Sequence, residues 1–199
     1  MVEAKEETMK KIVVALTVGA FAAGLPVLAQ THEGHTAAAA PKKMTNAQKI
    51  RLALSAGPAD ITKNAAVVAM AADGKTTELR KGTNGWMCMA GPEAMCLDKE
   101  WQNWANAYMA KKDPQIKGMG IGYMLRGDHG ASNTDPFATG KTATNNWVVS
   151  PPHIMVLTPD SKQLDALPTD WKSGGPWVMW KGPKYAHIMV PTTTMAAAK

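Results

Sequence analysis

The 199-residue chain is 45% hydrophobic and carries a formal net charge of +6. This apolar content excludes a wholly disordered chain and favours one folded domain with additional segments. The positive charges are scattered, whereas nucleic-acid binding requires a basic stripe or a known module, so we expect no nucleic-acid partner.

The first residues have the pattern of an export signal. Basic residues after Met9 precede an apolar run over residues 12–29 that ends in small residues. This pattern predicts a signal peptide over residues 1–29, with cleavage after Ala29. A start at Met9 would remove an acidic octapeptide that fits a signal poorly. Pro26 interrupts the run, which is short for a transmembrane helix, so we expect a periplasmic or secreted protein without a stable membrane anchor.

The sequence contains two cysteines, Cys88 and Cys96. In an oxidising compartment a disulfide between them is the expected state. The alternative is a thiolate metal site, but seven intervening residues do not match the spacing of zinc ligands.

A single globular domain is expected over residues 46–192. Residues 30–45 are polar and alanine-rich and read as a disordered linker, and residues 193–199 read as a flexible tail. Within the domain, residues 47–56 predict a short helix. Residues 65–82 predict a hairpin that turns at Asp73-Gly74.

The most regular helical pattern covers residues 98–112. Asp98 can cap its start, and an apolar stripe of Trp101, Trp104, Tyr108 and Met109 lies at helical spacing. Residues 117–125 alternate as a strand with three glycines on one face, and we expect this helix or a tryptophan to pack there.

A long loop, residues 126–146, separates this strand from several short strands near the C-terminus. The segments WVVS, HIMVLTP, WVMW and HIMVP are predicted to be strands, and SKQLDAL is predicted to be a short helix. The predicted fold class is α+β, a mainly antiparallel sheet with one long amphipathic helix at 98–112 and one or two short helices.

Five short segments give the chain a resemblance to a family. GTNGW, CLDK, ASNTDPFATG, VMWKG and AHIMVP, spread over residues 80–191, resemble an uncharacterised family of small secreted bacterial proteins. The resemblance implies an exported single domain and brings no activity or site residues.

The clearest candidate site is a repeated tetrapeptide, His-Ile-Met-Val, at residues 153–156 and 187–190. On a strand, His153 and Met155 share one face, as do His187 and Met189. The isoleucines and valines between them are expected to face the core. If the strands are neighbours, two imidazoles and two thioethers converge in a soft ligand set that favours copper, above all Cu(I). The alternative interpretation is ordinary packing, since methionine fills cores readily.

Two other histidines extend the copper hypothesis. Cleavage after Ala29 would place His32 third in the mature chain, where amine, amide and imidazole nitrogens form a square-planar set that suits Cu(II) or Ni(II). His129 is a candidate extra ligand. We therefore expect an exported copper-binding protein whose ligand is a metal ion or a small molecule.

Two alternatives stay open. Aromatic side chains at Trp171, Trp177, Trp180 and Tyr185 could form a patch that binds carbohydrate or another small ligand without metal. The 126–146 loop contains Asp128, His129 and Ser132, which could serve a hydrolase if they met, although no nucleophile-elbow motif surrounds the serine. The sequence favours a binding protein over an enzyme.

Overall fold

The computed structural model describes residues 43–71, 73–182 and 184–194. The predicted signal peptide, His32, most of the linker and most of the tail lie outside these residues. Within the described ranges, no helix combines the length and the apolar character that a bilayer span requires.

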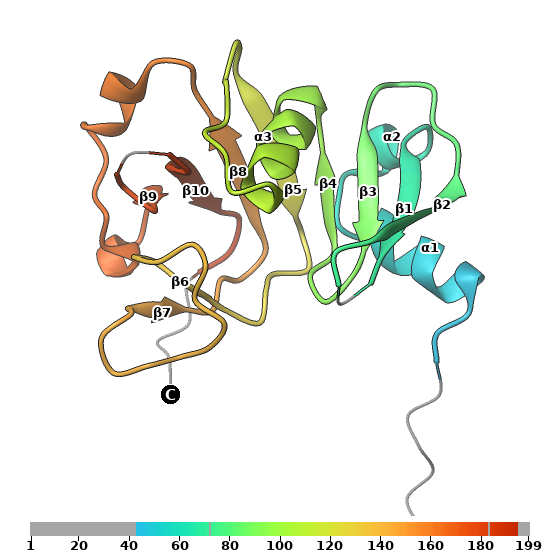
Figure 1. The fold of residues 1–199 in the computed structure, drawn as a ribbon, viewed down its shortest axis with the longest axis horizontal. Coiled ribbons are helices and arrows are strands. Elements are labelled where there is room, and N and C mark those ends of the chain that lie inside the picture. The colour runs from blue at the N-terminus through green and yellow to red at the C-terminus, as the bar shows by residue number, and fades with distance from the viewer. Residues whose placement is uncertain (1–42, 72, 183, 195–199) are drawn as a thin grey trace, which may run out of the picture. The chain divides into compact units, whose positions relative to one another are not determined.

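The chain is built mostly from one eight-stranded sheet, with strand order β2-β1-β3-β4-β5-β8-β10-β9 (Figure 1). Its strands are β1 (Ala66–Met70), β2 (Thr76–Arg80), β3 (Met87–Ala90), β4 (Met95–Leu97), β5 (Gly120–Met124), β8 (His153–Leu157), β9 (Trp177–Met179) and β10 (His187–Pro191). A separate two-stranded sheet pairs β6 (Ala131–Ser132) with β7 (Trp147–Val148).

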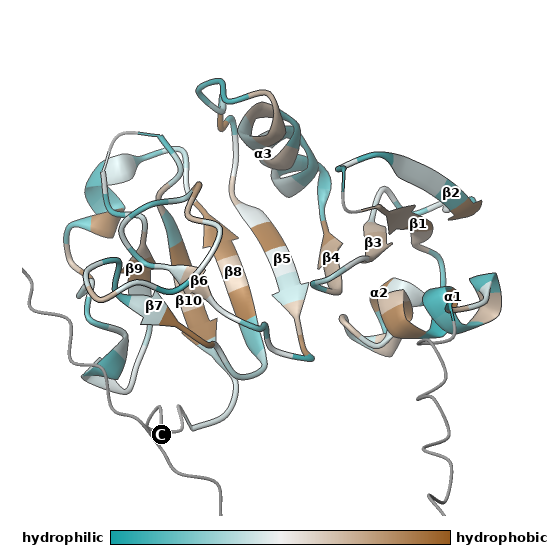
Figure 2. Cartoon of the chain, turned by 60° about the horizontal axis from the view of Figure 1, so that its bottom comes forward, coloured by the Kyte–Doolittle hydropathy of each residue, from teal (hydrophilic) through white to brown (hydrophobic). Residues whose placement is uncertain are grey.

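The helices are short and pack on both faces of the large sheet. They are α1 (Asn46–Leu54), α2 (Ala59–Thr62), α3 (Lys99–Met109) and the 3-10 helices η1 (Ser161–Leu164) and η2 (Trp171–Ser173). Helix α3 covers one face, where Trp101 and Trp104 join the larger core cluster. Helix α1 covers the opposite face at β1, β3 and β4, where Ala53 packs in a second, smaller cluster. Figure 2 shows α3 and α1 on opposite sides of the sheet.

The predicted fold class is wrong. The large sheet is mixed, because β1 pairs with β2 in antiparallel and with β3 in parallel orientation. The long amphipathic helix predicted at 98–112 is replaced by α3, which begins at Lys99 and ends at Met109. The chain is therefore a β-rich structure with short helices and is not organised around one long helix.

Backbone geometry explains why α3 ends early. Lys111 adopts a left-handed φ of 54°, and the Lys112 amide donates to the carbonyl of Ala107. This arrangement satisfies a terminal carbonyl and turns the chain away from the helix axis. The predicted start is confirmed, since Asp98 is the N-cap and accepts a hydrogen bond from the Trp101 amide.

The parallel pairing of β1 with β3 depends on a crossing of the chain at Gly82. After the predicted β1–β2 hairpin, which is confirmed, the chain returns past the start of β1 to reach its other side. A Cβ atom at Gly82 would lie 2.0 Å from the amide nitrogen of Ala66. Only glycine permits the two backbones to pass this closely.

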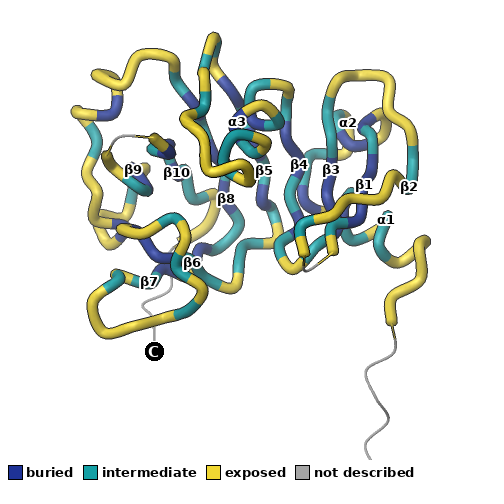
Figure 3. The backbone as a smooth tube through the Cα atoms, in the orientation of Figure 1, coloured by how far each residue is buried: buried dark blue, intermediate teal, exposed yellow. Residues whose placement is uncertain are grey.

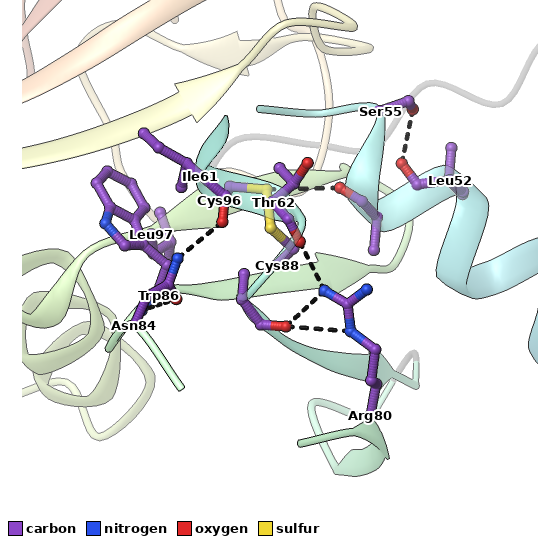
Figure 4. The surroundings of a disulfide bond; sticks show 12 residues. Leu52, Ser55, Ile61, Thr62, Arg80, Asn84, Trp86, Cys88, Cys96 and Leu97 are labelled. Carbon is purple, nitrogen blue, oxygen red and sulfur yellow. Dashed lines mark hydrogen bonds between the residues drawn. A yellow bond between two sulfur atoms is a disulfide. The ribbon is translucent and has the colours of Figure 1, made fainter. Parts of the chain in front are cut away.

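The predicted disulfide between Cys88 and Cys96 is confirmed and joins directly paired residues of β3 and β4. Figure 3 marks the central segments of these strands as buried. Figure 4 shows the bond beside the Arg80 guanidinium, which donates to the carbonyls of Thr62 and Ala65. The disulfide therefore lies in the smaller core cluster beneath α1.

Candidate functional site

The two copies of the His-Ile-Met-Val tetrapeptide lie on neighbouring strands. Strand β8 pairs with β10 in antiparallel orientation, and Met155 lies directly opposite Met189. His153 lies opposite Pro191 in the same register, so the two histidines occupy opposite ends of the paired strands. Because opposed residues and alternate residues share a face, both histidines and both methionines project from one face.

That face is the inner face of the sheet, which corrects the predicted orientation of the strands. The ligand candidates are all buried, with exposed fractions of 0% for His153, 7% for Met155, 3% for His187 and 2% for Met189. The intervening isoleucines and valines were expected in the core, but Ile154, Val156, Ile188 and Val190 lie on the opposite face and are partly exposed.

Both histidine rings are held by the same hydrogen bond. His153 Nδ1 lies 2.7 Å from the Pro151 carbonyl oxygen, and His187 Nδ1 lies 2.9 Å from the Tyr185 carbonyl oxygen. Because a carbonyl can only accept, each Nδ1 carries the proton and each Nε2 carries a lone pair. His153 Nε2 is fully buried and has no hydrogen-bond partner.

His187 lies among three tryptophans. Its ring packs edge to face against Trp101, Trp104 and Trp180, with centroid distances of 5.2, 5.7 and 5.1 Å. Burial lowers the pKa of His187 to about 4, a shift that the Tyr185 hydrogen bond opposes. At neutral pH the imidazole is therefore uncharged and can act as a ligand.

Two methionines of this face escaped the sequence analysis. Met124 on β5 lies opposite His153, and Met179 on β9 lies opposite His187. Both are buried. Met124 could have been found from the sequence, because it lies on the same face of the predicted 117–125 strand as the three glycines. With these residues, the inner face carries a stripe of two imidazoles and four thioethers.

Glycine on β5 makes room for this stripe. A Cβ atom at Gly122 would lie 2.9 Å from Met155 Cε and 3.4 Å from Trp101 Cδ1. The prediction that the helix or a tryptophan packs on the glycine face is confirmed. Trp101 also donates from Nε1 to the Met155 carbonyl oxygen at 3.1 Å, which fixes α3 over this part of the sheet.

The hydrolase candidates do not assemble. The side chain of His129 is 85% exposed, and its Nδ1 lies 2.9 Å from Glu93 Oε1. The Ser132 hydroxyl instead donates to the Asn145 carbonyl oxygen at 2.7 Å and accepts from the Asp135 amide at 2.8 Å. Ser132 therefore organises the 126–146 loop, and no hydrogen bond joins it to His129.

The proposed aromatic patch is largely core. Trp171, Trp177 and Tyr185 are buried, while Trp180 is partly exposed. Trp180 donates from Nε1 to the Ser132 carbonyl oxygen and stacks parallel to Trp104 at 6.0 Å. These four residues do not present a shared open surface to a ligand.

In the described part of the chain, no group of three or more histidine, cysteine, aspartate or glutamate side chains could hold a metal ion. A site on the inner face therefore depends on thioether ligands. Comparisons with models of protein families, with curated proteins and with solved structures gave no match for this chain.

Proposed function

We propose that this protein is an exported binding protein for a soft metal cation, most favourably Cu(I). The ligands would be the thioethers of Met155 and Met189 and the Nε2 atom of His153. The observation that carries the proposal is the placement of two directly opposed thioethers beside a buried imidazole lone pair without a partner. His187, Met124 and Met179 flank this set on the same face.

The chemistry of these ligands selects the cation. Thioether and imidazole ligands suit Cu(I), whereas carboxylate and carbonyl ligands suit harder ions. A histidine must be deprotonated to bind a metal, and burial lowers the pKa of both His153 and His187. The hydrogen bonds to Pro151 and Tyr185 orient the rings in the way that outer partners orient metal-binding histidines.

Export is supported by the Cys88–Cys96 disulfide, because such bonds persist mainly in oxidising compartments. The signal-like residues 1–29 support it independently. Cleavage after Ala29 would also create the Cu(II) site at His32 proposed from the sequence. Mass spectrometry of the secreted N-terminus tests that part, and any mature terminus other than Gln30 overturns it.

The test of the main site is a Cu(I) titration of the full chain against a competing chelator. Ascorbate serves as the reductant, because a thiol would compete for the metal and reduce the disulfide. A His32→Ala background removes any contribution from the N-terminus. We expect the Met155→Leu/Met189→Leu variant to lose more than about 100-fold in affinity, or about 2.7 kcal/mol. Leucine conserves volume, so the variant should remain folded.

Methionine also fills ordinary cores, so the control is a buried methionine outside the set. Met89 on β3 is buried in the same core cluster but lies three strands from β8. Met89→Leu should bind Cu(I) like the unsubstituted protein. Equal affinity in the double variant and the unsubstituted protein would reject the site.

A further inference from the structure

Two loops meet at the end of the sheet where His153 begins β8. Glu93, between β3 and β4, accepts hydrogen bonds at Oε1 from the backbone amide of His129 at 3.1 Å and from its ring Nδ1 at 2.9 Å. Glu93 and His129 are 36 residues apart in the chain, so this contact joins the disulfide-linked hairpin to the loop that follows β5. It places a carboxylate and an imidazole together at the surface.

Asp128 precedes His129 in the chain and is partly buried. Its Oδ1 accepts a hydrogen bond from the Ser150 amide at 2.8 Å. A second hydrogen bond, from the Asp128 amide to the Ser150 carbonyl oxygen at 3.0 Å, fixes Asp128 beside the segment that leads into β8.

Two buried polar atoms at and just before the start of β8 have no hydrogen-bond partner. They are the Ser150 hydroxyl and His153 Nε2, in residues that are 2% and 0% exposed. Buried polar atoms in native proteins are almost always hydrogen-bonded, and each exception calls for an explanation such as a bound water or ion. Ser150 and His153 are two such exceptions, and they lie only three positions apart in the chain.

We propose that Glu93, Asp128 and His129 form the entrance through which a soft cation reaches His153 and the methionines behind it. This inference rests on the proposed function. His129 is exposed, Glu93 and Asp128 are partly buried, and Ser150 and His153 are buried. Carboxylates attract a hydrated cation from solution, and the imidazole and thioethers then replace its water with softer ligands.

The opposite end of the stripe is closed. Trp101, Trp104 and Trp180 surround His187. Along β5, a Cβ atom at Gly120 would lie 2.9 Å from Glu100 Cβ, so α3 seals that side as well. Access from these directions would require α3 to separate from the sheet, whereas the Asp128 end is covered by the loops that carry Glu93, Asp128 and Ser150.

The test is stopped-flow binding of Ag(I), a soft cation that needs no reductant, followed by tryptophan fluorescence of the full chain. The variants are Asp128→Asn and Glu93→Gln, which keep the oxygen that accepts the Ser150 or His129 amide. We expect association to slow by at least about threefold, because the substituted residue no longer attracts the cation, with little change in dissociation. High salt should reduce the difference, because it screens the entrance charges.

The control is Asp165→Asn, which removes one exposed carboxylate that pairs with Lys181. It should leave both rates unchanged. If association and dissociation are as fast in Asp128→Asn and Glu93→Gln as in the unsubstituted protein, the entrance is rejected. The proposed metal site would not be affected by that result. A loss of equilibrium affinity with normal association would also overturn the entrance, because the residue would then be a ligand. Absence of Ag(I) binding by the unsubstituted protein would overturn the metal site itself.

Discussion

His187 and Trp101 pack edge to face, with ring centroids 5.2 Å apart and planes at 80°. Trp104 and Trp180 complete the surroundings of the imidazole. A charged imidazolium would lose its hydration at this position. Burial therefore lowers the pKa of His187 from 6.5 to about 4, and the ring stays neutral in the folded protein at neutral pH.

The first prediction is a loss of stability in mild acid. Between about pH 6.5 and about pH 4, the unfolded chain binds a proton at His187 that the folded chain does not bind. The free energy of unfolding should therefore fall as the pH decreases through this window, by on the order of 3 kcal/mol in total. Urea unfolding at a series of pH values measures the slope.

Two variants identify the source of this slope. His187→Gln should reduce it, leaving the part that His153 contributes, because burial also lowers the pKa of His153. Met89→Leu, a change at a buried side chain that does not titrate, should leave the slope unchanged. A slope that is equal in His187→Gln and the unsubstituted protein would contradict the assignment.

The second prediction concerns the carboxylate that fixes α3 to the sheet. Asp98 Oδ1 accepts from the Trp101 amide at 2.9 Å, and Oδ2 accepts from the Ile121 amide at 2.5 Å. Asp98→Ala should lower the free energy of unfolding by about 2–3 kcal/mol, because a helix cap and a partly buried hydrogen bond to β5 are lost together. Asp170 caps η2 through one exposed bond, so Asp170→Ala should cost about 1 kcal/mol or less in the same urea experiment. Equal losses would contradict the bridging role.

The third prediction tests the close packing of α3 on β5. Gly120→Ala would place a methyl group 2.9 Å from Glu100 Cβ, an atom that cannot move without the helix. We expect a loss of about 1–3 kcal/mol. Gly118 has no atom within 4 Å of the same position, so Gly118→Ala should be neutral or slightly stabilising. Thermal unfolding compares the two, and equal midpoints would contradict the packing.

Local patterns in the sequence predicted several of these features. The alternation in residues 117–125, the cap at Asp98 and the β1–β2 hairpin each depend on neighbours in the chain. The pairing of Cys88 with Cys96 is also short in range. Such features follow from strand and helix periods and from turn chemistry, so one sequence is enough to predict them.

The inner face of β8 and β10 could not be predicted in the same way. Alternation shows that His153 and Met155 share a face, but it does not show which face other elements cover. The cover comes from α3 and its tryptophans, which are about 50 residues away in the chain. The four hydrophobic Ile and Val residues favoured the opposite orientation, and tertiary packing overrode that preference.

The parallel pairing of β1 with β3 was missed for a similar reason. It depends on a crossing at Gly82 rather than on any periodic pattern. In the sequence, Gly82 looks like a simple loop residue. Only the approach of the Ala66 backbone makes a glycine necessary there.

The last prediction separates the disulfide from the proposed metal site. Cys88 and Cys96 are eight positions apart and belong to the core cluster beneath α1, whereas the His-Met stripe belongs to the cluster beneath α3. Cys88→Ala/Cys96→Ala should lower the free energy of unfolding by about 2–3 kcal/mol in the loop-entropy model, measured by urea unfolding. Reduction of the unsubstituted protein should reproduce this loss, and reductant should not affect the double variant. Cu(I) affinity should be unchanged in the folded variant, because both cysteines point to the opposite face of the sheet from Met155 and Met189. A large loss of affinity would instead show that the two faces are energetically coupled.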